Sequence, residues 1–157
     1  MSHELRVERL IDAAPVEVFD VFVDAEAQKE WYLDPEHPDG IVETECDARV
    51  GGLWTSAWGP GDDELYRETC VFRVVDRPRR LVMTCTATAP DGRSMETEVE
   101  VTFEEEGLRT RMTVVQRGFP TPELRDIIGS GWPVALEQLE RWVIARTRRS
   151  GVWSGEG

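Results

Sequence analysis

The chain has 157 residues, with 18 Lys and Arg against 31 Asp and Glu, and a formal net charge of −13. This length fits one domain that buries its own hydrophobic core, and the acidic balance argues against nucleic acids and anionic membranes as partners. No run approaches the ~18 apolar residues of a membrane-spanning helix, and the first residues lack an apolar signal core. We expect a cytoplasmic protein that is monomeric or homodimeric.

The N-terminal part of the chain predicts one strand and two short helices. Residues 4–11 alternate between apolar and charged side chains, which indicates a strand with one buried face. The segment around Pro15 ends this strand and begins a helix with an apolar stripe between Val18 and Val23. Residues 24–31 predict a second short helix, and the following loop, 33–40, is rich in residues that break regular structure.

The middle of the chain predicts strands joined by hairpins. Alternation and turn signals place these strands at 41–48, 53–58, 64–76, 80–88 and in the two arms of a hairpin at 94–117. In the first arm of this hairpin the apolar residues alternate with Glu96, Glu98 and Glu100, and Arg109 and Arg111 lie on the second arm. Opposite charges across two strands favour an exposed sheet face over a metal site.

The last patterned segment, 122–148, predicts a long helix. Thr121 can cap its N-terminus, and Pro122 fits the first helical position because its missing N–H costs nothing there. One face carries an apolar stripe at helical spacing, made of Ile128, Trp132, Leu136, Leu139 and Val143. The final segment, 150–157, is predicted to be a disordered tail.

Together these elements predict an α+β domain over residues 1–149. Strands joined by successive hairpins form an antiparallel sheet, and a long helix is buried economically when such a sheet curves around it. The expected fold is therefore a curved antiparallel sheet of about seven strands wrapped around the long C-terminal helix, with two short helices after the first strand.

Several stretches resemble a known family, and they occur in the family's order. They are Arg9–Phe19, Asp24–Glu26, Trp31–Tyr32, Arg49–Trp54, Pro78–Val82 and Gly131–Trp132. This set is similar to the activator of Hsp90 ATPase homologue-like family, within the START and pollen-allergen-like (SRPBCC) superfamily. The resemblance implies a helix-grip fold with a cavity between the sheet and the C-terminal helix. It implies no catalytic residue, because the family motif contains none.

Few residues could carry chemistry. His3 and His37 are the only histidines, and His37 lies in an acidic loop whose spacing fits no metal motif. The three cysteines, Cys46, Cys70 and Cys85, lack C-x-x-C spacing, so we predict reduced cysteines on strands rather than a disulfide framework or a zinc site. The sequence therefore predicts no metal, no cofactor and no catalytic residue.

Aromatic and sulfur-containing side chains fall on the faces assigned to the interior. Core packing explains each of them alone, whereas together they fit an apolar pocket with a few polar groups. The predicted ligand-binding residues are Trp31, Trp54, Trp58, Tyr66, Met83, Met112 and Trp132. Glu68 shares the face of Tyr66 and, if it points inward, is the one candidate acid or base. A solvated strand end is the placement we favour for it.

Three hypotheses of function are open. The first is a non-enzymatic carrier or sensor that binds a small hydrophobic molecule between the sheet and the helix. The second is a cyclase- or hydratase-like enzyme that shapes a polyketide-like substrate and moves a proton with one acid or base. The third is a chaperone-binding module resembling the Hsp90 ATPase activator, which requires a contiguous exposed apolar patch.

Overall fold

The computed structural model describes residues 3–31, 41–61 and 64–155. Its elements follow the predicted order. The strands are β1 (His3–Ile11), β2 (Ile41–Cys46), β3 (Leu53–Gly59), β4 (Tyr66–Asp76), β5 (Arg80–Thr88), β6 (Ser94–Glu106) and β7 (Arg109–Phe119), and the helices are α1 (Pro15–Phe22), α2 (Ala25–Trp31) and α3 (Pro122–Gly155).

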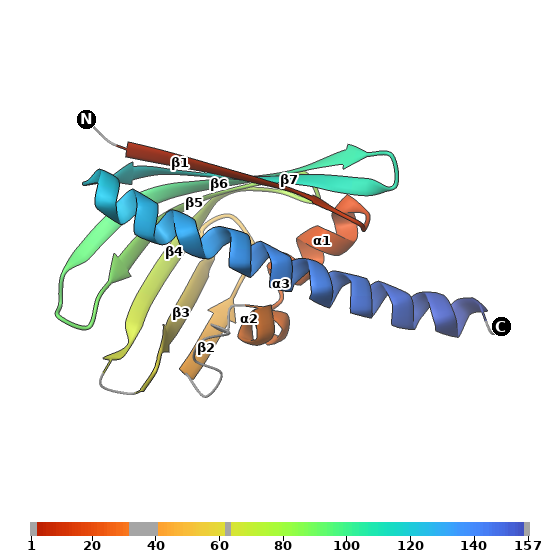
Figure 1. The fold of residues 1–157 in the computed structure, drawn as a ribbon, viewed down its shortest axis with the longest axis horizontal. Coiled ribbons are helices and arrows are strands. Elements are labelled where there is room, and N and C mark those ends of the chain that lie inside the picture. Colours follow the sequence, from red (N-terminus) through yellow and green to blue (C-terminus); the bar gives the residue numbers. More distant parts are fainter. Residues whose placement is uncertain (1–2, 32–40, 62–63, 156–157) are drawn as a thin grey trace.

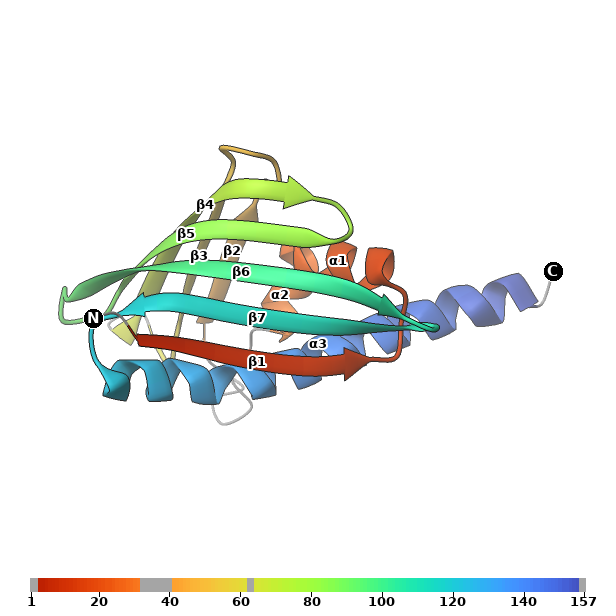
Figure 2. The same cartoon turned by 90° about the horizontal axis from the view of Figure 1, so that it is seen from above.

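The strands form one seven-stranded antiparallel sheet in the order β1-β7-β6-β5-β4-β3-β2. Each strand from β2 to β7 pairs with its neighbours in sequence, and β1 adds to the free side of β7. The sheet curves, and α3 lies across its concave face with β1 running alongside the helix (Figures 1 and 2). This architecture confirms the predicted helix-grip α+β fold.

The local sequence explains where α3 begins and which face it buries. Thr121 Oγ1 accepts a hydrogen bond from Leu124 N at 3.2 Å, which caps the first turn as predicted. The apolar stripe faces the sheet, since Leu136, Leu139 and Val143 are at most 1% exposed. The two earlier members of the stripe are partly buried, and the polar residues of the opposite face are exposed.

The C-terminal end of α3 differs from the prediction. The helix continues past residue 148 to Gly155, through most of the segment that was predicted to be a disordered tail. This segment contains glycine but no proline, and a helix that is already formed extends at a small cost per residue. In Figure 1 the last part of α3 projects beyond the sheet. Neither α3 nor any other described helix is long and apolar enough to cross a membrane.

The core lies between the helices and the concave face of the sheet. At its centre, the ring of Phe103 on β6 meets Phe19 and Phe22 of α1 edge-on, with centroids 5.2 and 6.0 Å apart. At the margin of the core, Arg9 of β1 and Glu140 of α3 form an ion pair at 2.7 Å. The ring contacts join α1 to the sheet, and the ion pair joins α3 to the edge strand. The assignment of residues 1–149 to a single domain stays a prediction.

The outer face of β6 and β7 carries paired charges, as predicted. Arg117 lies opposite Glu98 in the register of these strands. Its guanidinium is 3.4 Å from the Glu98 carboxylate and 3.2 Å from that of Glu100. The glutamate run is therefore part of a sheet face that is partnered by arginines.

The turn between β6 and β7 is tight. The first strand runs to Glu106 and the second begins at Arg109, so only Gly107 and Leu108 form the turn. Gly107 has a φ of +64°, a conformation that glycine adopts without steric cost. Leu108 is 92% exposed because it lies in this turn.

Replacing Leu139 with alanine should lower the free energy of unfolding by about 2–5 kcal/mol, because the change leaves a cavity beneath a fully buried helix position. Urea unfolding followed by tryptophan fluorescence measures this difference. Val134→Ala is the matched control, because Val134 lies on the same helix but is 41% exposed, and it should change stability by only about 0.5 kcal/mol. Equal unfolding midpoints for the two variants would contradict the packing of α3 described above.

Candidate ligand-binding site

The concave sides of β3 and β4 bring candidate aromatic and polar residues together. Strand alternation puts Trp54, Ser56 and Trp58 on one side of β3. The register of the two strands then places Ser56 opposite Glu68, and Trp58 opposite Tyr66. Because α3 covers this side of the sheet, these side chains are the ones that could line a space between the sheet and the helix.

Four of the seven predicted ligand-binding residues are closed inside the core. Trp31, Trp54, Met83 and Met112 are at most 4% exposed. The ring of Trp31 stacks on Phe22 with centroids 5.4 Å apart, and Trp54 meets the same phenyl ring at 5.3 Å in an edge-on arrangement. In this structure the four side chains stabilise the core, and a ligand would have to displace them to make contact.

A buried polar cluster, which the sequence analysis missed, also holds Trp54. Its Nε1 donates to Thr44 Oγ1 at 3.2 Å, and this hydroxyl donates to Gln28 Oε1 at 2.6 Å. Gln28 is fully buried, and its amide nitrogen donates to the carbonyl of Phe22 at 2.8 Å. The one sequence signal for this cluster is the three-residue spacing between Gln28 and Trp31, which puts both on one face of α2.

The other three predicted residues keep contact with solvent. Trp58 and Trp132 are partly buried, and Tyr66 is 47% exposed. The rings of Trp58 and Tyr66 stack with centroids 6.0 Å apart and an interplanar angle of 16°. Tyr66, which was predicted to line a pocket, is more exposed than expected because it is the first residue of β4. We call Trp58, Tyr66 and Trp132 the accessible aromatic group.

A chain of hydrogen bonds links Trp132 to the middle of the sheet. Trp132 Nε1 donates to Gln116 Oε1 at 3.0 Å, and Gln116 Nε2 donates to Thr97 Oγ1 at 3.0 Å. Both sheet residues are at most 4% exposed. The sequence analysis missed Gln116, although alternation along β7 places it on the same face as Met112 and Val114.

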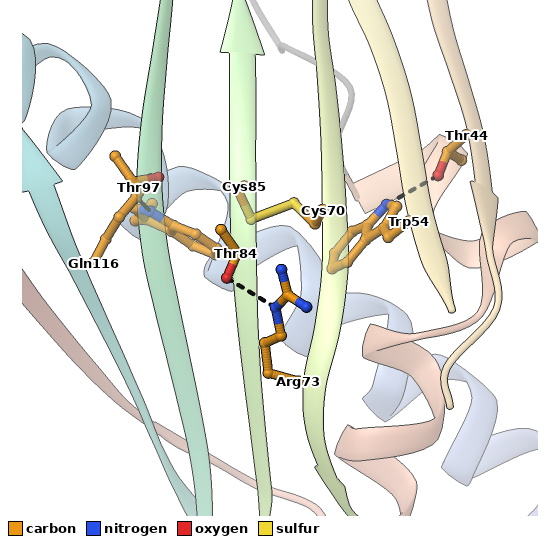
Figure 3. Close-up of a disulfide and its surroundings, with 9 residues drawn as sticks. Thr44, Trp54, Cys70, Arg73, Thr84, Cys85, Thr97 and Gln116 are labelled. Atoms are coloured by element: carbon orange, nitrogen blue, oxygen red, sulfur yellow. Dashed lines mark hydrogen bonds between the residues drawn. A yellow bond between two sulfur atoms is a disulfide. The ribbon is translucent and has the colours of Figure 1, made fainter. Parts of the chain in front are cut away.

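Cys70 and Cys85 form a disulfide, which corrects the prediction of reduced cysteines. The two residues lie directly opposite each other on β4 and β5, with Cα atoms 4.0 Å apart. Figure 3 shows the bond between Trp54 on one side and Thr97 and Gln116 on the other. Their separation of 15 residues could not reveal the pairing, because the pairing depends on the register of the two strands.

A β-bulge in β4 produces this register. On the turn side of the bulge Val74 pairs with Val82, and the same register, if continued, would place Cys70 opposite Thr86. The shift at the bulge moves the pairing by one residue and brings Cys70 opposite Cys85 instead. A shift of one residue in register changes which residues lie opposite each other on paired strands. The disulfide therefore forms because the bulge brings the two cysteines opposite each other.

Glu68 lies two residues before Cys70 on the same inner face of β4. The side chain is partly buried, so its predicted placement at a solvated strand end is wrong. Burial raises the pKa of Glu68 from 4.5 to about 7. Among the described residues, no hydrogen bond or ion pair to its carboxylate opposes this shift. A carboxyl group with this pKa can take up or release a proton near neutral pH.

Two hollows on the described surface lie away from the space beneath α3. One is formed by the end of β2, the following turn and the start of β3, and includes Arg49 and Leu53. Another is formed by outward side chains of β1, β6 and β7, among them Arg6, Glu100 and Arg117. Both open on the convex side of the sheet, so a ligand cavity between the sheet and the helix stays a proposal.

Outside the described residues lie the loop 33–40 with His37, and Asp62 and Asp63.

The curved sheet, the long helix across it and the partly accessible inner face define a helix-grip protein. Residues 12–143 match the family model described as "Activator of Hsp90 ATPase homolog 1-like protein", and the chain belongs to this family. The family and its superfamily commonly bind hydrophobic ligands. No curated protein matches the chain.

Solved structures of several other proteins share the fold. A protein from Chromobacterium violaceum is 22% identical, with a TM-score of 0.77, and the match covers 89% of this chain and 96% of that one. A protein from Rhizobium loti is 22% identical, with a TM-score of 0.76 and coverage of 90% and 96%. A protein from Arthrobacter aurescens is 22% identical, with a TM-score of 0.73 and coverage of 90% and 86%. At these identities the likeness concerns the fold alone.

The stability of the protein should depend on the ionisation of Glu68. Because its pKa is raised in the folded state, the folded protein retains a proton that the unfolded chain releases between pH 4.5 and about 7. The contribution of this retained proton to the free energy of unfolding is fully present below pH 4.5 and is lost as the pH rises through 7. Glu68→Gln mimics the protonated acid and does not lose this contribution. Its free energy of unfolding relative to the wild type should therefore rise by up to about 3 kcal/mol between pH 4.5 and pH 8.

Urea unfolding of both proteins at the two pH values measures this gain. Glu106→Gln is the control, because the hydrogen bond from Arg111 lowers the pKa of Glu106 and its contribution to stability is already present above pH 4.5. The stability difference between that variant and the wild type should therefore be nearly the same at both pH values. A stability difference between Glu68→Gln and wild type that is the same at both pH values would mean that Glu68 is solvated.

Proposed function

We propose that the protein is a non-enzymatic carrier or sensor that binds a small hydrophobic molecule between the sheet and α3. The observation that carries the proposal is that side chains on the concave face differ in how deeply they are buried. Most of its apolar side chains are at most 4% exposed, whereas Trp58, Glu68 and Trp132 remain partly accessible and Tyr66 is half exposed. Large aromatic residues that stay accessible on an inner face are suited to contact a ligand.

The chemistry of these side chains favours a particular class of ligand. The stacked rings of Trp58 and Tyr66 offer aromatic faces, to which a flat or conjugated molecule can add in an offset or edge-on arrangement. Glu68 and Gln116 can receive a hydroxyl or amine group. The net charge of −13 disfavours an anion. The proposed ligand is therefore a flat apolar molecule, uncharged or cationic, with one hydrogen-bond donor.

An enzyme of the cyclase or hydratase kind is the second candidate, and Glu68 supports it. A general acid or base is most effective when its pKa lies near the working pH, and burial raises the pKa of Glu68 to about 7. In this alternative, Glu68 takes a proton from a polyketide-like substrate or returns it, and the aromatic residues hold the substrate in a reactive shape. The two candidates differ in one result: loss of the Glu68 carboxylate should abolish turnover in the enzyme but not ligand binding in the carrier.

The chaperone-binding alternative has weaker support. The large hydrophobic residues that are exposed in the described part of the chain are spread over several elements and turns: Leu10, Val16, Val50, Leu53, Tyr66, Leu108, Ile127 and Val134. A docking surface for another protein usually gathers such residues into one patch. The cytoplasmic location, and the choice between monomer and homodimer, stay predictions.

Replacing Trp58 with alanine should weaken binding of a hydrophobic probe about tenfold, because it removes one aromatic partner worth roughly 1.5 kcal/mol at this site. The measurement is a titration with the uncharged fluorophore N-phenyl-naphthylamine, read as saturable probe emission and quenching of tryptophan fluorescence. Leu53→Ala is the matched control, since Leu53 lies on the same strand but its side chain is on the convex face and 47% exposed. This control should bind the probe like the wild type.

Two outcomes would contradict the carrier proposal. One is a wild-type protein that does not bind the probe to saturation. The other is equal affinity in the Trp58→Ala variant and the wild type, with both proteins folded by circular dichroism. In either case the accessible aromatic group serves packing rather than binding.

A further inference from the structure

Two sulfur atoms and one carboxylate meet on the concave side of β4 and β5. The ligand-type atoms of Glu68, Cys70 and Cys85 all lie within 4.8 Å of one another. Within the described residues this is the one cluster of three such groups that could hold a metal ion. Both cysteines are at most 4% exposed, so the cluster belongs to the interior rather than to a solvated acidic surface.

The carboxylate of Glu68 is an independent sign of a missing partner. It lies on a partly buried strand face and, among the described residues, forms no ion pair and accepts no hydrogen bond. A buried charge without a partner is unfavourable, and either a proton or a cation removes the penalty. The residues opposite Glu68 in register are Ser56 and Ala87, whose short side chains leave the carboxylate uncrowded.

The spacing of the cluster suits a tetrahedral metal ion. Zinc binds cysteine sulfur at ~2.3 Å and carboxylate oxygen at ~2.0–2.2 Å, which puts neighbouring ligand atoms roughly 3.5–3.8 Å apart. Atoms that already lie within 4.8 Å of one another can reach these distances by rotation of the side chains. The paired strands keep the Cα atoms of the two cysteines 4.0 Å apart, so both sulfur atoms stay near a common point.

We propose that reduction of the Cys70–Cys85 disulfide converts this cluster into a zinc site, with the two thiolates and the Glu68 carboxylate as protein ligands. A fourth position is left for water or for a heteroatom of a bound molecule. Three protein ligands with one open position are typical of catalytic zinc sites rather than structural ones. The proposal does not depend on the ligand-binding function above, because the metal cluster can be tested in the absence of any organic ligand.

The conversion has a defined balance. A dithiol reductant attacks the disulfide by thiol–disulfide exchange and supplies two electrons and two protons. The dithiol becomes a disulfide, and Cys70 and Cys85 become thiols. Binding of Zn²⁺ then releases the two thiol protons to solvent, because only thiolates coordinate the ion. In the oxidised protein both sulfur atoms are bonded to each other, so the site is absent.

Titration with Co²⁺, the spectroscopic substitute for Zn²⁺, tests the proposal on the full chain. The protein is reduced with dithiothreitol and then freed of it by anaerobic gel filtration. Complete reduction raises the thiol count in denaturant from one to three, since the structure has one free cysteine and the chain has three cysteines in all. The reduced protein should take up one Co²⁺ per chain, with a sulfur-to-cobalt charge-transfer band and intense visible bands of tetrahedral cobalt. Added Zn²⁺ should displace the Co²⁺ and remove these bands.

Three variants separate the ligands. Cys70→Ser should abolish the charge-transfer band. Glu68→Gln keeps both cysteines and should weaken Co²⁺ binding at least about tenfold, the lower limit for loss of even an outer-shell group. Cys46→Ser is the control: Cys46 lies on β2, and burial raises the pKa of its thiol to about 11, so this variant should bind Co²⁺ like the wild type.

The result that would overturn the proposal is a reduced, folded protein with three counted thiols that shows no charge-transfer band. Equal binding in the oxidised protein, or unchanged affinity in Glu68→Gln, would also overturn it, because the first excludes the thiolates as ligands and the second excludes Glu68. Circular dichroism of each variant confirms that the fold is present before Co²⁺ is added.

Discussion

The structure depends on the burial of one face of α3 against the concave side of the sheet. Leu136, Leu139 and Val143 are closed off there, and the Arg9–Glu140 ion pair fixes the helix to the edge strand. Removing this apolar surface from water is the main stabilising contribution, at about 25 cal/mol per Å². The curvature of the sheet around the helix (Figure 1) then follows as the way to bury both elements together.

The same helix divides the concave face into two parts. The C-terminal half of α3 contacts α1 and α2, for example through the hydrogen bond from Gln138 to the carbonyl of Trp31, and the aromatic core closes beneath it. The earlier turns contact the other end of the sheet, where Trp132 donates to Gln116 and Gly129 lies near Leu5. Side chains remain accessible at this second end, which is why the proposed binding residues are those of the accessible aromatic group.

Glu68 links the proposed roles of this protein through one physical property. A partly buried carboxylate requires a proton, a hydrogen-bond donor or a cation, and the described residues provide no partner for it. A ligand with a donor group, a substrate that exchanges a proton, or a metal ion shared with two thiolates would each meet that need. These occupants differ in what else they contact: the aromatic rings for the first two, and the sulfur atoms of Cys70 and Cys85 for the third.

Residue spacing was enough to predict most of the elements and the faces that they bury, because the periods of helix and strand are local properties of the chain. The stripe from Ile128 to Val143, the Thr121 cap and the shared face of Trp54 and Trp58 all follow from spacing alone. Spacing could not predict which inner residues are buried in the core and which stay accessible, because exposure depends on what the helices cover. It could not predict the Cys70–Cys85 pairing either, since a bulge in β4 shifts the register by one residue and no local pattern predicts that shift.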